Sequence, residues 1–263
     1  MIDSGSVDTA TLDSIYRYPV KGLSPEGMDR VSLRAGLTLP EDRRYAIENG
    51  PSGFDPANPQ SLPKIKFLML MRNERLASLH TRYDATSHVL TIHHHGCELV
   101  RGDLDTAAGR AAIEDFFATT FAKELRGPPR LLSAAGHSFS DVARKVVSII
   151  NLSSVAELER LVGQDVNPLR FRANLYVSGW PAWHEFALVG STLAIGEARL
   201  KVVKRIVRCA AVNVDPVTAV RDLELPHAMM RNYGHDDCGI YADVIADGDI
   251  AVGDTIRVLS SPA

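Results

Sequence analysis

The residues best suited to chemistry lie in one basic segment that ends on a cysteine. Between positions 199 and 208, five of ten residues are lysine or arginine, none is acidic, and Cys209 follows directly. A neighbouring cation stabilises the thiolate, which is the form of cysteine that attacks electrophiles and binds soft metals. Because strand residues alternate between two faces, the five cations cannot all point to one side. A solvent-exposed strand face that ends on a small buried thiol explains the same pattern.

The remaining thiols and histidines are weaker candidates. Cys238 follows Asp236 and Asp237, and adjacent carboxylates disfavour a thiolate. The three histidines at 93–95 suggest a metal site, but only the first and third share a strand face. We therefore expect a polar edge strand that leads to a turn at Gly96. The sequence contains no glycine-rich phosphate loop and no G-x-S-x-G nucleophile motif, the signatures of nucleotide binding and of one hydrolase class.

Several other cations stand beside strand-like segments or turns. They are Lys21, Arg43, Arg44, Arg170, Arg172 and Arg208. Each alone is by default a surface charge, whereas together around one cleft they would bind an anion. Their spacing leaves open whether they converge.

Short β-type runs separated by glycine and proline dominate the chain. We expect strands at 28–33, 43–47, 67–71, 76–83, 89–94, 146–150, 174–177, 192–195, 200–207, 240–245 and 255–259. A helix is predicted at 105–125, because one face would carry Ile113, Phe116, Phe117 and Phe121. A shorter helix is expected near 225–230. A further helix begins at Ser154, which forms a capping box with Glu157, and ends at Gly163. The Gly127-Pro128-Pro129 break divides the chain into two β-rich units.

Composition restricts the class of protein. The 263 residues carry 29 basic and 32 acidic side chains, a net charge of −3, which argues against a nucleic-acid or membrane-surface partner. No apolar run is long enough to span a membrane. The residues before Arg17 include Asp3 and Asp8 and no cation, so no secretory leader is expected. Three cysteines without a C-x-x-C pair are typical of a reducing compartment, and we expect a cytoplasmic protein.

A series of motifs in consistent order resembles a known family. Residues 15–21 and 42–47 resemble the N-terminal β-barrel domain that precedes MOSC domains. The second half resembles the MOSC domain itself, named for the C-terminal domain of molybdenum cofactor sulfurase, at 147–155, 170–175, 208–209, 214–216 and 251–254. The whole arrangement is similar to the mitochondrial amidoxime-reducing component and its bacterial relatives.

This resemblance implies a mainly β, β-rich α+β fold. An N-terminal β-barrel-like domain at 9–128 would pack on a MOSC-type β-barrel with peripheral helices at 129–260. The pterin-dithiolene molybdenum cofactor would bind between the two, with Cys209 as the metal ligand. The cofactor-binding residues implied by the resemblance are Lys21, Arg43, Arg172, Asn174 and Arg208.

The implied function is that of a molybdenum-dependent oxidoreductase that reduces N-hydroxylated small molecules. Its electrons would come from a separate ferredoxin, flavodoxin or cytochrome, because three cysteines cannot hold a plant-type iron–sulfur cluster. A carrier of the cofactor or of sulfur, with Cys209 as a persulfide site, is the alternative, since the same thiolate suits both roles. Gly22 and Val207 stand where the family often has serine, so a β-rich protein that has lost the cofactor is a third possibility.

Overall fold

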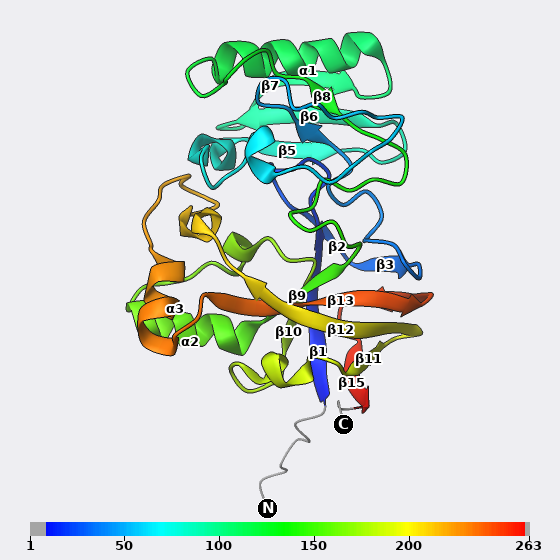
Figure 1. The fold of residues 1–263 in the computed structure, drawn as a ribbon, viewed down its shortest axis with the longest axis vertical. Helices are drawn as coiled ribbons and strands as arrows, with labels where there is room; N and C mark the ends of the chain where they lie inside the picture. Colours follow the sequence, from blue (N-terminus) through cyan, green and yellow to red (C-terminus); the bar gives the residue numbers. More distant parts are fainter. Residues whose placement is uncertain (1–8, 261–263) are drawn as a thin grey trace, which may run out of the picture.

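Seven strands close into a barrel within residues 9–260, the part of the chain that the computed structural model describes (Figure 1). In barrel order they are β1 (Thr9–Arg17), β10 (Leu175–Ser178), β9 (Val147–Asn151), β13 (Asp237–Ala246), β12 (Ala198–Val207), β11 (Thr192–Ile195) and β15 (Thr255–Ser260). Alternate residues of β12 point inward, so that Ala198, Leu200 and Val202 are buried in the barrel core. The expected mainly β fold with a barrel and peripheral helices is thereby confirmed.

Strand β1, the first described element of the chain, belongs to the barrel that the second half forms. It pairs with β15 on one side and with β10 on the other, and β2 (Glu26–Met28) extends its far end. The sequence patterns did not predict β1, because a bulge between Leu12 and Ser14 interrupts its period of two. The barrel therefore includes a strand from the unit expected at 9–128, and the boundary at 128 stays a prediction.

The other lobe contains the sheet β5 (His80–Tyr83), β6 (Val89–His94) and β7 (Cys97–Asp103), covered by helix α1 (Ala107–Thr120) (Figure 1). A Cβ atom added to Gly102 of β7 would lie 2.3 Å from the carbonyl oxygen of Gly109 in α1. Glycine at this position therefore allows the helix to approach the sheet closely. Buried Ile113 and Phe117 form the inner face of α1, as the sequence predicted. Strand β6 is central in this sheet, so the expected edge strand at the histidines is wrong.

Two small sheets of two strands each complete the fold. Strand β3 (Arg30–Leu33) pairs with β14 (Gly248–Ala251), and β4 (Ala46–Ile47) pairs with β8 (Leu131–Leu132). Residues 67–71 form a turn with one bridge from Phe67 to Glu48 in place of the expected strand. The expected strand at 76–83 is shortened to β5, and the one at 43–47 to β4. A run of apolar residues predicts that they are buried, as Phe67 and Leu68 are. It does not predict that they pair with another strand.

Helix α2 (Leu152–Val162) connects the parallel strands β9 and β10. Its N-cap is Asn151, whose side chain accepts from the Ser153 amide at 3.2 Å. The capping box at Ser154 and Glu157 is therefore wrong: Ser154 is buried, and its hydroxyl donates to Glu185 at 2.8 Å. Gly163 ends the helix in a left-handed conformation, as predicted. The third helix, α3, covers Leu225–Tyr233.

The expectations that no segment spans a membrane and that no secretory leader is present depend on different parts of the chain. Among residues 9–260, no helix has the length and apolarity that crossing a bilayer requires. The expectation that no secretory leader is present depends on Asp3 and Asp8, which lie outside the described residues.

Candidate functional site

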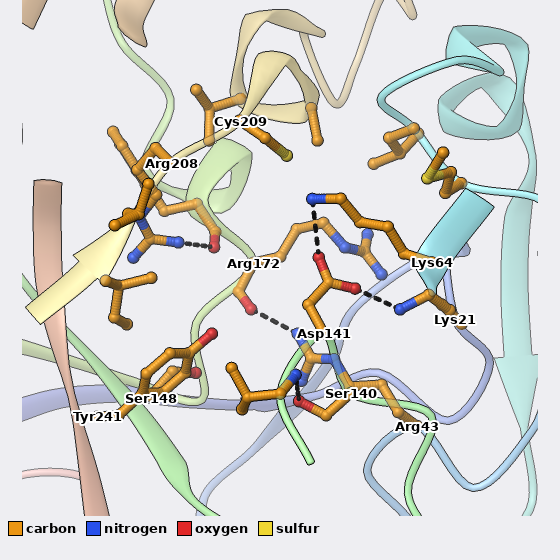
Figure 2. Close-up of a pocket in the computed structure, with 18 of the residues that line it drawn as sticks. Lys21, Arg43, Lys64, Ser140, Asp141, Ser148, Arg172, Arg208, Cys209 and Tyr241 are labelled. Carbon is orange, nitrogen blue, oxygen red and sulfur yellow. Dashed lines mark hydrogen bonds and ion pairs between the residues drawn. The ribbon is translucent and has the colours of Figure 1, made fainter. Parts of the chain in front are cut away.

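A pocket of about 420 Å³ lies between the barrel and the lobe that carries α1, and the six site residues implied by the family resemblance line it. Lys21, Arg43, Arg172, Arg208 and Cys209 come together there (Figure 2), and Asn174 also lines the pocket. The barrel contributes residues of β9, β12 and β13, and the opposite wall is formed by residues of the loops at Lys21 and 64–71. The convergence that sequence spacing left open therefore exists in the structure.

Strand β12 delivers the basic segment to the pocket. Lys204, Arg205 and Arg208 line it, whereas Lys201 turns away and donates to the Gly190 carbonyl. The strand ends at Val207, and the Arg208 amide donates to the Asp236 carbonyl at 2.9 Å. Cys209 then caps a 3₁₀ turn over Ala210–Asn213 and remains partly accessible. The thiol is thus presented at the wall of the pocket and not buried in the core.

The Arg208 guanidinium is buried and only partly satisfied. Its Nε donates to the Cys238 carbonyl at 2.7 Å, and its Nη1 donates to the Phe171 carbonyl at 2.9 Å. Its Nη2 is buried and finds no hydrogen-bond partner among residues 9–260. A buried cationic donor without a partner is costly, so Arg208 retains a donor that still lacks an acceptor.

Arg172 is the second cation with a free donor in the pocket. It follows the 3₁₀ turn Pro168–Phe171 and adopts a left-handed conformation with φ of 50°, which is strained for a residue other than glycine. Its guanidinium carbon lies 4.2 Å from the centre of the Tyr18 ring. Its Nη2 is buried and unpartnered within the described part of the chain. Burial lowers the pKa of Arg172 to about 10, which indicates an environment that favours an added anion.

Lys21 and Lys64 share one carboxylate in the middle of the pocket. Lys21 donates to the Phe139 carbonyl at 2.8 Å and forms an ion pair with Asp141. Lys64 lies 3.4 Å from the other oxygen of Asp141 (Figure 2). Burial opposes ionisation of Asp141, but the two lysines, Lys21 foremost, lower its pKa to about 2. For Lys64, burial lowers the pKa, but Asp141 and the Cys209 thiol outweigh burial, and the pKa is raised. Lys64 is therefore a cation beside the thiol.

Two predicted residues are held by the protein itself. Asn174 accepts from the Ser148 hydroxyl at 2.8 Å and donates to the Tyr16 carbonyl at 3.2 Å. Its amide therefore ties β9 to β1 and positions Ser148, which also lines the pocket. Arg170 lines the pocket too, but its side chain is 1% exposed and paired with Asp215 and Asp222, so its charge is already neutralised.

The remaining sequence candidates lie elsewhere. Arg44 is paired with Glu41 at 2.8 Å and is not among the described residues that line the pocket. Cys238 is buried in β13, and burial raises the pKa of its thiol to about 12, so it is a poor nucleophile. No group of three histidine, cysteine or acidic side chains within 9–260 is arranged to hold a metal, and this includes the histidines at 93–95.

Sequence reasoning missed Lys64, Ser140, Asp141 and Tyr241, all of which line the pocket. Asp141 meets Lys21 across 120 positions and Lys64 across 77. Local spacing contains no signal for such contacts. The run Pro63-Lys64-Ile65-Lys66 gives no indication of which lysine turns inward.

Comparison with known proteins gives consistent matches over both halves. The MOSC N-terminal beta barrel domain model matches residues 9–127, and the MOSC domain model matches 132–257. Molybdenum cofactor sulfurase of Caenorhabditis briggsae is 35% identical over 117 residues, which is 43% of this chain and 16% of that protein. Mitochondrial amidoxime reducing component 2 of Bos taurus is 30% identical over 122 residues, or 42% of this chain and 36% of that protein. The YUAD protein structure from Bacillus subtilis aligns over 95% of both chains at 15% identity, with a TM-score of 0.45.

Proposed function

Because the chain belongs to the MOSC family, with a MOSC N-terminal beta barrel domain ahead of a MOSC domain, we propose that its basic pocket binds the molybdenum cofactor. We further propose that the bound form reduces N-hydroxylated small molecules. The observation that carries this proposal is the meeting of one accessible thiol with two unpartnered buried guanidinium donors in a single pocket. Those donors belong to Arg172 and Arg208.

The chemistry of the lining residues suits a phosphorylated pterin with a soft metal. Guanidinium and ammonium groups are the side chains that bind phosphate oxygens, and a thiolate is a preferred ligand for a soft metal centre. The orphaned Nη2 atoms of Arg172 and Arg208 lack an acceptor within residues 9–260 that an anionic ligand would provide. A pocket of about 420 Å³ lies within the usual range for small-molecule sites.

The proposal assigns a role to each group. Lys21 and Lys64 would bind the phosphate, Arg172 and Arg208 the remaining acceptors, and Arg43 and Asn174 would support the walls. Cys209 would be the protein ligand to the metal. When bound, the cofactor would supply the two-electron redox chemistry. The overall reaction removes one oxygen from the substrate as water and consumes two protons and two electrons, the latter from a separate donor protein.

The chain's own residues would prepare the site for this reaction. Lys64 holds a positive charge beside the Cys209 thiol and so adds to the cations that an anionic ligand would meet in the pocket. The Arg208 hydrogen bonds to two carbonyls fix the backbone that precedes Cys209. Rigid placement of the ligand residue limits the reorganisation that binding requires.

A carrier function is supported by the same partly accessible thiol. Cys209 is partly accessible and next to a lysine, and the chain is 35% identical to a molybdenum cofactor sulfurase over 117 residues. A persulfide would form when the Cys209 thiolate attacks the terminal sulfur of a cysteine desulfurase persulfide. A new S–S bond then forms at Cys209, and the desulfurase cysteine leaves as a thiolate.

One experiment distinguishes the two functions. The full chain is produced in a cofactor-competent host, analysed for molybdenum, and assayed with benzamidoxime and reduced viologen. Many turnovers to benzamidine per bound molybdenum would support the reductase. Labile radioactive sulfur on Cys209 without turnover, in protein that contains molybdenum, would support the carrier. Protein that acquires neither molybdenum nor sulfur would contradict both proposals.

A further inference from the structure

One acidic side chain of the pocket, Asp141, pairs with two of its lysines and can be replaced there by a ligand anion. Two of the described lining residues are acidic, Asp42 and Asp141. Asp42 is buried, accepts from the Tyr18 amide at 2.8 Å and pairs with Arg43, so it belongs to the framework. The Asp141 side chain is 45% exposed, and its oxygens contact the two lysines Lys21 and Lys64.

The segment that carries Asp141 is anchored at one point and open beyond it. Phe139 is buried, and its amide donates to the Arg43 carbonyl at 2.8 Å. After Phe139 the chain turns through residues 140–145, where Asp141, Ala143, Arg144 and Lys145 are exposed. Arg144 pairs with Asp243 outside the pocket. Asp141 can therefore leave the lysines without disturbing the buried anchor.

Lys21, in contrast, cannot be left without an anion. Its side chain is 8% exposed, and an unpaired buried ammonium is strongly unfavourable. A ligand anion that reaches Lys21 is repelled by the Asp141 carboxylate on the same ammonium. The ligand therefore binds best in place of that carboxylate, and breaking the ion pair with Lys21 reduces its affinity.

We propose that Asp141 is a specificity-determining residue, which competes with the ligand for Lys21 and Lys64 and so admits dianionic phosphate groups while excluding monoanions. This inference rests on the proposed function in one respect, since it assumes that the ligand of this pocket carries a phosphate. A phosphate monoester brings nearly two charges and three strong acceptor oxygens. A monoanion brings no more charge than the carboxylate it would replace, so it gains nothing from the exchange.

The test measures anion binding to the cofactor-free full chain by calorimetry at about pH 8, where inorganic phosphate is mostly a dianion. Inorganic phosphate and methanesulfonate are the two probes. The wild-type protein is expected to bind phosphate and not methanesulfonate. Asp141→Asn should bind phosphate about tenfold more tightly and should bind methanesulfonate measurably, because the internal competitor is gone. Equal or weaker phosphate binding by Asp141→Asn would overturn the inference.

The control variant is Asp243→Asn, which breaks the ion pair of the same segment with Arg144 and leaves both lysines untouched. It should bind phosphate as the wild type does, and a tenfold gain in this variant would overturn the role of Asp141. If Asp141→Asn fails to fold, limited proteolysis of the wild type provides the second measurement. Saturating phosphate should speed tryptic cleavage after Arg144 and Lys145, whereas methanesulfonate should not; an unchanged rate with phosphate would overturn the exchange.

The outcome is independent of molybdenum. If phosphate competes with Asp141 as described but protein from a cofactor-competent host contains no molybdenum, the proposed function fails and this inference stands. Protein purified with bound cofactor should no longer bind inorganic phosphate, because the cofactor's own phosphate would hold the lysines. Undiminished phosphate binding by that protein would overturn the assignment of this site to the cofactor.

Discussion

Arg43 donates from its Nη2 to the backbone carbonyl of Arg172 at 2.8 Å, across 129 positions of the chain (Figure 2). Both residues adopt left-handed conformations, with φ of 51° and 50°, and both guanidinium groups lie over the Tyr18 ring. Arg43 is neutralised by Asp42 at 2.5 Å. Arg43 therefore fixes the strained backbone of Arg172, and Arg172 keeps its own donor free for the pocket.

This arrangement predicts a specific effect of Arg172→Ala on cofactor binding. A hydrogen bond to a charged group contributes about 1.5–3 kcal/mol, which is roughly one to two decades in affinity. The molybdenum and pterin content of the purified variant should fall accordingly after dilution and gel filtration. Arg160→Ala is the control, because Arg160 is 73% exposed and pairs with Glu157 on the surface. Full retention by Arg172→Ala would show that its free donor does not bind the ligand.

Replacement of Cys209 should remove activity without unfolding the protein. Cys209→Ser is expected to abolish molybdenum-dependent turnover, because a hydroxyl is a poor ligand for a soft metal. Its free energy of unfolding should change by no more than about 1–2 kcal/mol. Cys97→Ser, at an exposed position in β7, should keep full activity. Equal losses in the two variants would reject Cys209 as the metal ligand.

Gly22→Ser should destabilise the protein, because Gly22 has a backbone conformation and close contacts that a side chain would not fit. Gly22 has φ of 83°, and an added Cβ would lie 3.2 Å from the Leu68 carbonyl oxygen and from Leu76 Cδ1. The left-handed conformation alone costs a residue with a side chain about 1–2 kcal/mol. Gly36→Ser is the matched control, because Gly36 has φ of 73° and open space around it. Urea unfolding should show a larger loss for Gly22→Ser, and equal losses would show that the contacts relax freely.

The Asp141 carboxylate should make stability depend on acid pH. Although burial opposes its ionisation, the lysines lower its pKa to about 2 in the folded protein, against about 3.9 for an unfolded aspartate. Its contribution is therefore fully present above about pH 5 and is lost as the pH falls toward 2. Urea unfolding between those limits should show a steeper loss for the wild type than for Asp141→Asn. Parallel curves for the two proteins would indicate that the ion pair with Lys21 does not contribute.

Local rules predicted the elements whose residues interact with near neighbours. Helix α1 was predicted because Ile113 and Phe117 recur at helical spacing, and the end of α2 because Gly163 permits a left-handed stop. The start of α2 was missed because the Ser154 hydroxyl binds Glu185, 31 positions away, and not the helix end. A capping motif competes with any stronger buried partner, and such a partner is invisible in the local pattern.

For the candidate site, too, the sequence identified some features and only the fold decided others. The family resemblance of the ordered motifs selected Lys21, Arg172, Arg208 and Cys209, and all four line the pocket. Residue type and spacing alone left each cation a surface charge by default. Arg170 had the same signal, yet the fold neutralises it with Asp215 and Asp222. Charged residues in the sequence are thus only candidates for ligand binding. Ion pairing in the fold decides which of them remain available to a ligand.

The sequence by itself determined the β-rich class, the principal helices and the residue types of an anion pocket with a thiol, because these depend on short-range periodicity and on side-chain chemistry. Only the tertiary structure decided that β1 closes the barrel with β10 and β15, and that Asp141 meets Lys21 and Lys64. The physical reason is distance along the chain. Pairings between residues far apart in sequence are stabilised by burial and charge in the assembled fold, and their energies leave no pattern in the neighbouring residues.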